Sequence, residues 1–278
     1  MKNLLFTSTL FLIFNFSFAQ TKINRHSIEE VLKWKVKFIA TSTYTAVEKF
    51  GEIEKGSLRY KVTYKCDVKG NEIECNVYDT YGGLDNKGTN KYDEKGNEIE
   101  RKVYNYLLSW GTKYTYKYDE KGNKIEDNTY NDDGSLRHKQ TYKYDEMGNE
   151  IEAIDYKADG SLNEKSKSKF DEKGNKIEGN YYNADGSLET KFKNKFDKMG
   201  NEIEFNSYNA DGSLILKNTF KYDEKGNQIE WNQYNAYGSL RLKITSKYEF
   251  DTMGNWIKKT VIENGKPTDL TERVIEYY

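Results

Sequence analysis

The sequence predicts an all-β fold, an array of about eight antiparallel β-hairpin repeats that forms a curved or superhelical sheet. Two turns that alternate at a fixed spacing predict it: a Gly-Asn pair recurs every 26 residues, and an Asp-Gly-Ser-Leu turn recurs between these pairs. The Gly-Asn glycines are Gly70, Gly96, Gly122, Gly148, Gly174, Gly200 and Gly226, with Gly254 after a 28-residue step. Two turns in 26 residues leave room for two strands of about eight residues each.

The N-terminal residues have the pattern of a secretory signal peptide. Lys2 is basic, an apolar run extends from Leu4 to Phe18, and Ala19 supplies the small residue before the cleavage site. A membrane anchor is the alternative, but polar residues interrupt the run, and a spanning helix needs about 20 apolar residues. We therefore expect a secreted or periplasmic protein that is cut after Ala19 and is not membrane-embedded.

The segment between the signal and the first repeat breaks the period. Ser27-Ile28-Glu29-Glu30 fits a capping box and predicts a short helix, and residues 34–38 alternate like a strand. Repeat arrays need atypical ends, so we interpret this segment as a cap. The expected divisions are a signal peptide over 1–19, an N-terminal cap over 20–56 and the repeat array over 57–278.

The strands of each repeat carry one charged face. Lysines recur from Lys61 to Lys243 and glutamates from Glu74 to Glu230, so neighbouring strands should interleave the two charges on the wet face.

The apolar residues of each repeat set the expected register. Keeping them together places Tyr182 opposite Leu188 and Lys143 opposite Glu150. Ile125 and Tyr130 are five residues apart and would alternate onto opposite faces, so we predict a β-bulge in that interval.

Composition excludes some partners. The formal net charge is −1 and the charges alternate, whereas a nucleic-acid binder usually has a basic face, so a nucleic-acid partner is not expected. Cys66 and Cys75 flank a tight turn, and their positions on the two strands lie too far apart for a disulfide within that hairpin. We expect both cysteines to be free and to fill apolar space.

Three short motifs recur in neighbouring copies: Tyr118-Asp119, Gly122-Asn123 followed by Ile125, and Asp133-Gly134. On these motifs the array, residues 57–278, resembles the YD or RHS repeat of secreted bacterial proteins. The resemblance implies a β-sheet shell and a role in cell-surface or carbohydrate binding. The 26-residue unit is longer than the usual one, and no toxin domain follows the array, so encapsulation is not expected.

The sequence contains no recognisable catalytic or metal-binding motif. His26 and His138 have no Cys, Ser or metal-ligand partner at a known spacing. The loop 131–135 is similar to a calcium loop, but Gln140 stands where an EF-hand needs Glu. We expect no enzyme, metal or cofactor. A hydrolase stays open as an alternative, because the fold can bring two carboxylates together.

Aromatic side chains are the candidate binding residues. The position two residues after each repeat isoleucine varies, with Cys75, Arg101, Asp127, Ala153, Gly179, Phe205 and Trp231 in successive repeats. Phe205 and Trp231, with Tyr181 nearby, would form a platform on which sugar rings stack. Local packing is the alternative.

The predicted function is a secreted, non-enzymatic β-repeat protein that binds carbohydrate, another cell-envelope component or a protein partner. The alternative is a structural component of a surface assembly that self-associates through its terminal strands.

Overall fold

The computed structural model describes residues 36–278, and these residues form one sheet of 18 strands. The strands are β1 (Val36–Lys49), β2 (Glu52–Cys66), β3 (Glu72–Tyr78), β4 (Leu84–Tyr92), β5 (Glu98–Asn105), β6 (Trp110–Tyr118), β7 (Lys124–Tyr130), β8 (Leu136–Tyr144), β9 (Glu150–Lys157), β10 (Leu162–Phe170), β11 (Lys176–Asn183), β12 (Leu188–Phe196), β13 (Glu202–Asn209), β14 (Leu214–Tyr222), β15 (Gln228–Asn235), β16 (Leu240–Phe250), β17 (Trp256–Glu263) and β18 (Lys266–Tyr277). Turns that contain glycine join the consecutive strands, as the sequence predicts, except between β5 and β6, where Ser109 has the positive φ.

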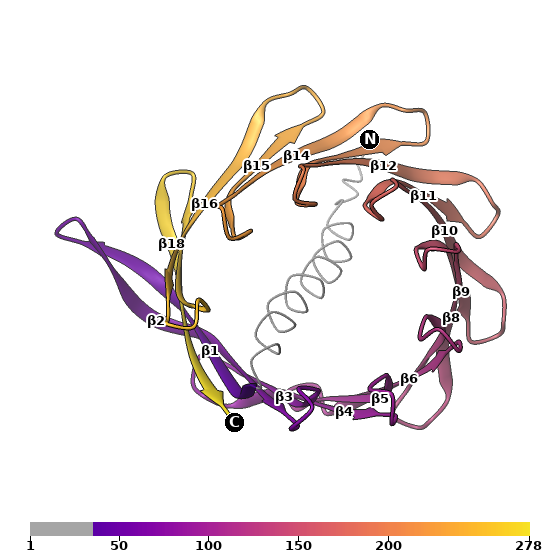
Figure 1. Ribbon diagram of the computed structural model, residues 1–278, viewed down its shortest axis with the longest axis horizontal. Coiled ribbons are helices and arrows are strands. Elements are labelled where there is room, and N and C mark those ends of the chain that lie inside the picture. Colours follow the sequence, from indigo (N-terminus) through magenta and orange to yellow (C-terminus); the bar gives the residue numbers. More distant parts are fainter. Residues whose placement is uncertain (1–35) are drawn as a thin grey trace, which may run out of the picture.

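The sheet closes on itself as a barrel (Figure 1). Each strand pairs antiparallel with the next, and β1 pairs with β2 on one side and with β18 on the other. The β1–β18 register extends from Val36 opposite Tyr277 to Thr45 opposite Asp269. Ile39, only 2% exposed, lies in this closing seam between Tyr64 of β2 and Ile275 of β18.

The predicted open, curved or superhelical sheet is therefore wrong. Twist and strand tilt curl a sheet of this size. The sheet then closes because β1 pairs with β2 on one edge and with β18 on the other. Residues 36–56 were expected to form a cap but belong to the barrel wall, in β1 and β2. The helix expected at Ser27–Glu30 and the signal peptide lie outside the described residues. Within residues 36–278, no helix has the length and apolar character needed to span a membrane.

The register is partly as predicted. Tyr182 does lie opposite Leu188, but Lys143 pairs with Glu152 and not with Glu150, because Ile151 is left unpaired in a bulge. A bulge is present in each repeat, but the predicted position is wrong: it lies at the isoleucine and not between the isoleucine and the tyrosine, as Ile125 is unpaired against β6 whereas Asn128 pairs with Thr115. The bulge lets apolar residues follow a turn without moving the charged column to the other face.

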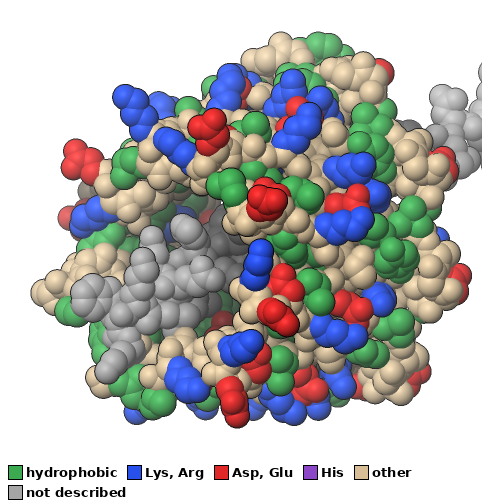
Figure 2. All heavy atoms as spheres, turned by 45° about the vertical axis from the view of Figure 1, so that its right-hand side comes forward, with side chains coloured by type: hydrophobic (Ala, Val, Ile, Leu, Met, Phe, Trp, Pro, Cys, Tyr) green, Lys and Arg blue, Asp and Glu red, His purple; other side chains and the backbone are tan. Residues whose placement is uncertain are grey.

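The charged columns are confirmed. Glu126 lies 2.7 Å from Lys117 and 2.8 Å from Lys139, and the neighbouring repeats have the same arrangement. The Lys117 side chain is 66% exposed and the Glu126 side chain 15%, so each glutamate lies beneath two lysines. Figure 2 shows these positive and negative side chains over the outer surface, interspersed with apolar ones.

The two rims of the barrel differ in how their turns pack. In each Gly-Asn turn an aspartate anchors the asparagine: Asp93 accepts the backbone N–H of Asn97 at 2.8 Å and its side-chain amide at 2.9 Å. A Cβ on Gly174 would lie 3.2 Å from Oδ1 of Asn149, which belongs to the preceding turn. On the other rim a Cβ on Gly186 would meet nothing within 4 Å. The Gly-Asn turns therefore contact one another, whereas the Asp-Gly-Ser turns project separately.

This difference predicts unequal effects of two matched substitutions, Gly174→Ala and Gly186→Ala. Both glycines have positive φ, +80° and +83°, so each alanine should cost about 1–2 kcal/mol of stability. Gly174→Ala should cost roughly 1 kcal/mol more, because its methyl group displaces the Asn149 amide. Urea unfolding followed by circular dichroism measures both. Equal losses would show that adjacent turns do not support each other.

Candidate binding surface inside the barrel

Strand alternation assigns the variable column to the barrel interior. Glu126 and Lys117 pair on the outer face, so their neighbours Asp127 and Tyr116, which also pair with each other, face inward. The same register holds in the other repeats. The interior column is Cys75, Arg101, Asp127, Ala153, Gly179, Phe205 and Trp231. Both cysteines are free, as predicted.

Two of the three predicted binding residues, Tyr181 and Phe205, both contact the ring of Phe192, which the sequence did not predict as a binding residue. The ring centroids of Tyr181 and Phe192 are 5.9 Å apart, and those of Phe192 and Phe205 are 5.8 Å apart and stacked. Phe192 lies over Gly179, where a Cβ would overlap the phenyl ring. Gly179 was the available signal, since a glycine inside a strand often marks a close approach by another group.

The third predicted residue, Trp231, lies two strands beyond Phe205 on the same wall. It pairs with Phe220 of β14 and with Ile244 of β16, both interior positions. Its indole Nε1 is buried and has no hydrogen-bond acceptor among residues 36–278. The wall from β11 to β16, along the top of the ring in Figure 1, is therefore largely aromatic and aliphatic. Whether these residues bind a ligand stays a prediction.

The interior wall from β3 to β10 differs because it has ion pairs among its tyrosine rings, such as Tyr116 and Tyr142. Arg101 binds Glu98 through two hydrogen bonds of 2.9 and 3.0 Å. Asp127 accepts from Lys124 at 2.9 Å and from the hydroxyl of Tyr142. Burial, together with the Asp127 carboxylate, raises the pKa of Tyr142, so this hydroxyl stays protonated. The interior thus has one aromatic side and one ion-paired side.

One repeat has an acid pair that the other repeats lack. Asp155 of β9 lies opposite Glu164 of β10, and Nδ1 of His138 is 3.6 Å from Asp155. Burial first, and then Asp155, raise the pKa of Glu164. The equivalent pairs contain no acid; examples are Val77 with Asn86 and Tyr181 with Thr190.

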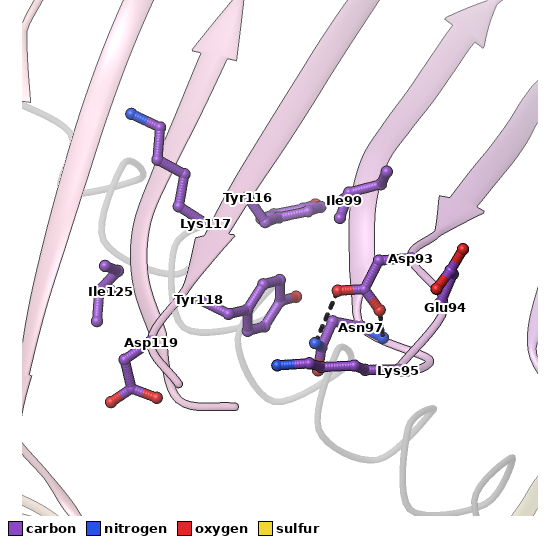
Figure 3. A pocket seen from close by; sticks show the side chains of 10 residues that line it. All are labelled: Asp93, Glu94, Lys95, Asn97, Ile99, Tyr116, Lys117, Tyr118, Asp119 and Ile125. Carbon is purple, nitrogen blue, oxygen red and sulfur yellow. Dashed lines mark hydrogen bonds between the residues drawn. The ribbon is translucent and has the colours of Figure 1, made fainter. Parts of the chain in front are cut away.

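A hollow of about 600 Å³ lies near the Gly-Asn rim, between β4 and β7 (Figure 3). Tyr116, Tyr118 and Ile99 contribute its apolar side chains, and the Asp93–Asn97 turn borders it. The hydroxyl of Tyr118 is already used, since it donates to the carbonyl of Glu98 at 2.8 Å. The hollow lies away from the predicted residues.

No family model and no curated protein matches the chain. Among solved structures it is similar to a porin-like protein from Bacteroides uniformis, with 10% identity, a TM-score of 0.44, and coverage of 87% of this chain and 96% of that one. A porin-like protein from Bacteroides vulgatus has 12% identity and a TM-score of 0.35, over 88% of this chain and 99% of that one. A TcdB2–TccC3–Cdc42 complex has 14% identity and a TM-score of 0.33, over 84% of this chain but only 14% of that chain.

The expected resemblance to YD or RHS repeat proteins is corrected by these findings, and so is the description as a β-hairpin binding module. The chain closes as an 18-strand barrel and matches no family model. The motifs that carried the resemblance are turn residues: Gly122 N–H donates to the carbonyl of Asp119 at 3.1 Å. Tight hairpins need such residues in any repeated β-structure. The motifs therefore indicate turns and do not identify a protein family.

The expectation that the chain is not membrane-embedded is overturned as well. It relied on the lack of a second long apolar stretch, but a barrel crosses a bilayer with short strands and needs no such stretch. The closed barrel therefore removes the basis of that expectation.

Proposed function

We propose that this chain is a non-enzymatic protein of the bacterial cell envelope whose barrel interior is a binding surface, with carbohydrate as the ligand class. The supporting observation is the interior aromatic series Tyr181, Phe192 and Phe205, continued by Trp231 two strands further on. Flat rings on a rigid wall suit the apolar faces of sugar rings. The ion-paired wall opposite would keep the interior wet.

A glycan panel tests this function directly. The mature protein should bind at least one envelope polysaccharide, and a Phe205→Ala/Trp231→Ala double variant should lose at least tenfold in affinity. Tyr81→Ala/Tyr237→Ala is the matched control, since these rings are 96% and 94% exposed and lie on turns. Circular dichroism shows whether each variant keeps its fold. No binding by the folded wild type would refute the carbohydrate proposal.

The location within the envelope has its own test. The outer wall has ion-paired columns such as Lys117–Glu126, whereas lipid-facing barrel walls have an apolar band about 25 Å tall. Fractionation of cells distinguishes an outer-membrane barrel from a periplasmic one. Release only by detergent would place the barrel in the outer membrane, and release by osmotic shock would place it in the periplasm. Binding inside the barrel is compatible with both.

The acid pair Asp155 and Glu164 favours a second candidate, a glycoside hydrolase. Two inward carboxyl groups on neighbouring strands, one of them with a raised pKa, are the kind of pair that such enzymes use. The same glycan panel, read by mass spectrometry for shortened chains, tests it. Hydrolysis that disappears in Glu164→Gln would establish an enzyme. Binding without products would support the non-enzymatic proposal.

The alternative of assembly through terminal strands loses its structural basis. β1 and β18 would provide the free edges, but within the described barrel they pair with each other. Sedimentation velocity across a hundredfold concentration range should therefore show one constant species.

A further inference from the structure

Two cations lie side by side on the interior face near the closing seam. Lys259 of β17 pairs with Tyr248 of β16 and with Thr271 of β18, and Arg273 follows two residues along β18 on the same face. The Arg273 guanidinium lies 3.4 Å from the ring centroid of Trp256, and Nζ of Lys259 lies 5.4 Å from that of Tyr248. The pair is thus held against aromatic rings.

Lys259 differs from the cations of the ion-paired wall. Arg101 and Lys124 each have a carboxylate partner at 2.9 Å, Glu98 and Asp127 respectively. Within residues 36–278, the contact of Lys259 is with a tyrosine ring and not with an acid. Burial, and then the neighbouring Arg273, lower its pKa. A largely buried cation without an anion is costly, so an arriving anion would be stabilised there.

The aromatic wall connects this pair to Trp231. Trp231 pairs with Ile244 of β16, and Lys259 pairs with Tyr248 of the same strand. Tyr248 lies four residues after Ile244. Strand spacing and rise place Trp231 about 16 Å from Lys259. A short oligosaccharide spans that length, whereas a single sugar does not. The unpaired indole N–H of Trp231 would donate to a sugar hydroxyl at the far end.

We propose that Lys259, beside Arg273, binds the carboxylate of an acidic oligosaccharide whose sugar rings lie along the aromatic wall toward Trp231. The inference rests on the proposed function, because it names the chemical class of the carbohydrate. A carboxylate accepts a hydrogen bond from the Lys259 ammonium, and its negative charge compensates this largely buried cation.

Calorimetry with trigalacturonate and its full methyl ester tests the inference, since only the acid carries charge. The wild type should bind the acid at least tenfold more tightly than the ester. Lys259→Gln should lose that preference, and Lys259→Arg should keep it. Lys258→Gln is the control on the same strand, because Lys258 faces outward and pairs with Glu249 at 2.8 Å. It should bind like the wild type.

Equal affinity for acid and ester in the wild type would overturn the anion site, and so would an unchanged preference in Lys259→Gln. No binding of trigalacturonate by the folded wild type would overturn it too. Neutral glycans separate this failure from that of the proposed function: if they bind and Trp231→Ala abolishes the binding, the aromatic surface stands without an anion site. Lys259→Gln should melt no lower than the wild type, which excludes misfolding as the cause of a lost preference.

Discussion

Replacing Ile39 with alanine should destabilise the barrel by about 3 kcal/mol, the usual cost of truncating a fully buried aliphatic side chain. Ile39 is 2% exposed and packs with Val36, Tyr64, Ile275 and Tyr277 at the closing seam. For a chain of this size that loss lowers the melting temperature by roughly 10 °C. Thermal unfolding followed by circular dichroism measures the shift.

Ile151→Ala is the matched control for the seam. Ile151 is also an isoleucine of the wall, but it is 37% exposed and unpaired in its bulge. Its truncation should cost about 1 kcal/mol, because less apolar surface is lost. If both variants melted together, the seam would contribute no more than any other position of the wall.

Acid should destabilise the barrel strongly through its glutamate columns. Hydrogen bonds from Asn76 and two lysines lower the pKa of Glu74 to about 2. Lysine and asparagine partners likewise lower the pKa values of Glu126, Glu204 and Glu230 to about 2. A lowered pKa in the folded state means that the stabilisation is complete above about pH 4.5 and is lost as the pH falls through about 2.

The expected magnitude is modest for each glutamate and large in sum. The lysine partners are well exposed and screened by solvent, so about 1 kcal/mol for each glutamate is reasonable, or about 4 kcal/mol for the four. Melting curves from pH 7 to pH 2 measure this loss, which 1 M salt at pH 7 should partly reproduce. Glu126→Gln should lose about 1 kcal/mol at pH 7 and almost nothing at pH 2. A melting temperature independent of pH would contradict the prediction.

Local features of this fold follow from the sequence because their causes are local. Glycines at positive φ, such as Gly174, and the lysine and glutamate columns recur at a fixed spacing, so turns and faces can be assigned from the period. Closure cannot be assigned in this way. It depends on the accumulated tilt of 18 strands and on β1, which has none of the repeat motifs.

The candidate site was predictable in part for the same reason. The variable column identified Phe205 and Trp231 but not the side of the wall that they occupy, since alternation alone does not say which face is inside. Phe192 was missed because its role appears only when β12 is placed in register with β11. Lys259 was missed because the 28-residue step moves it out of the 26-residue column.

The antiparallel meander also constrains how such a barrel changes over generations. Each repeat contributes two strands, so gain or loss of one whole unit keeps the number of strands even. The first and last strands then still run in opposite directions and can close the ring with the same residues. Loss of half a unit would bring them together in parallel and leave the seam without its partners. The circumference of the barrel can therefore change by duplication or loss of one 26-residue unit. Each duplication adds two strands and widens the interior, while the pairing of the first and last strands is unchanged.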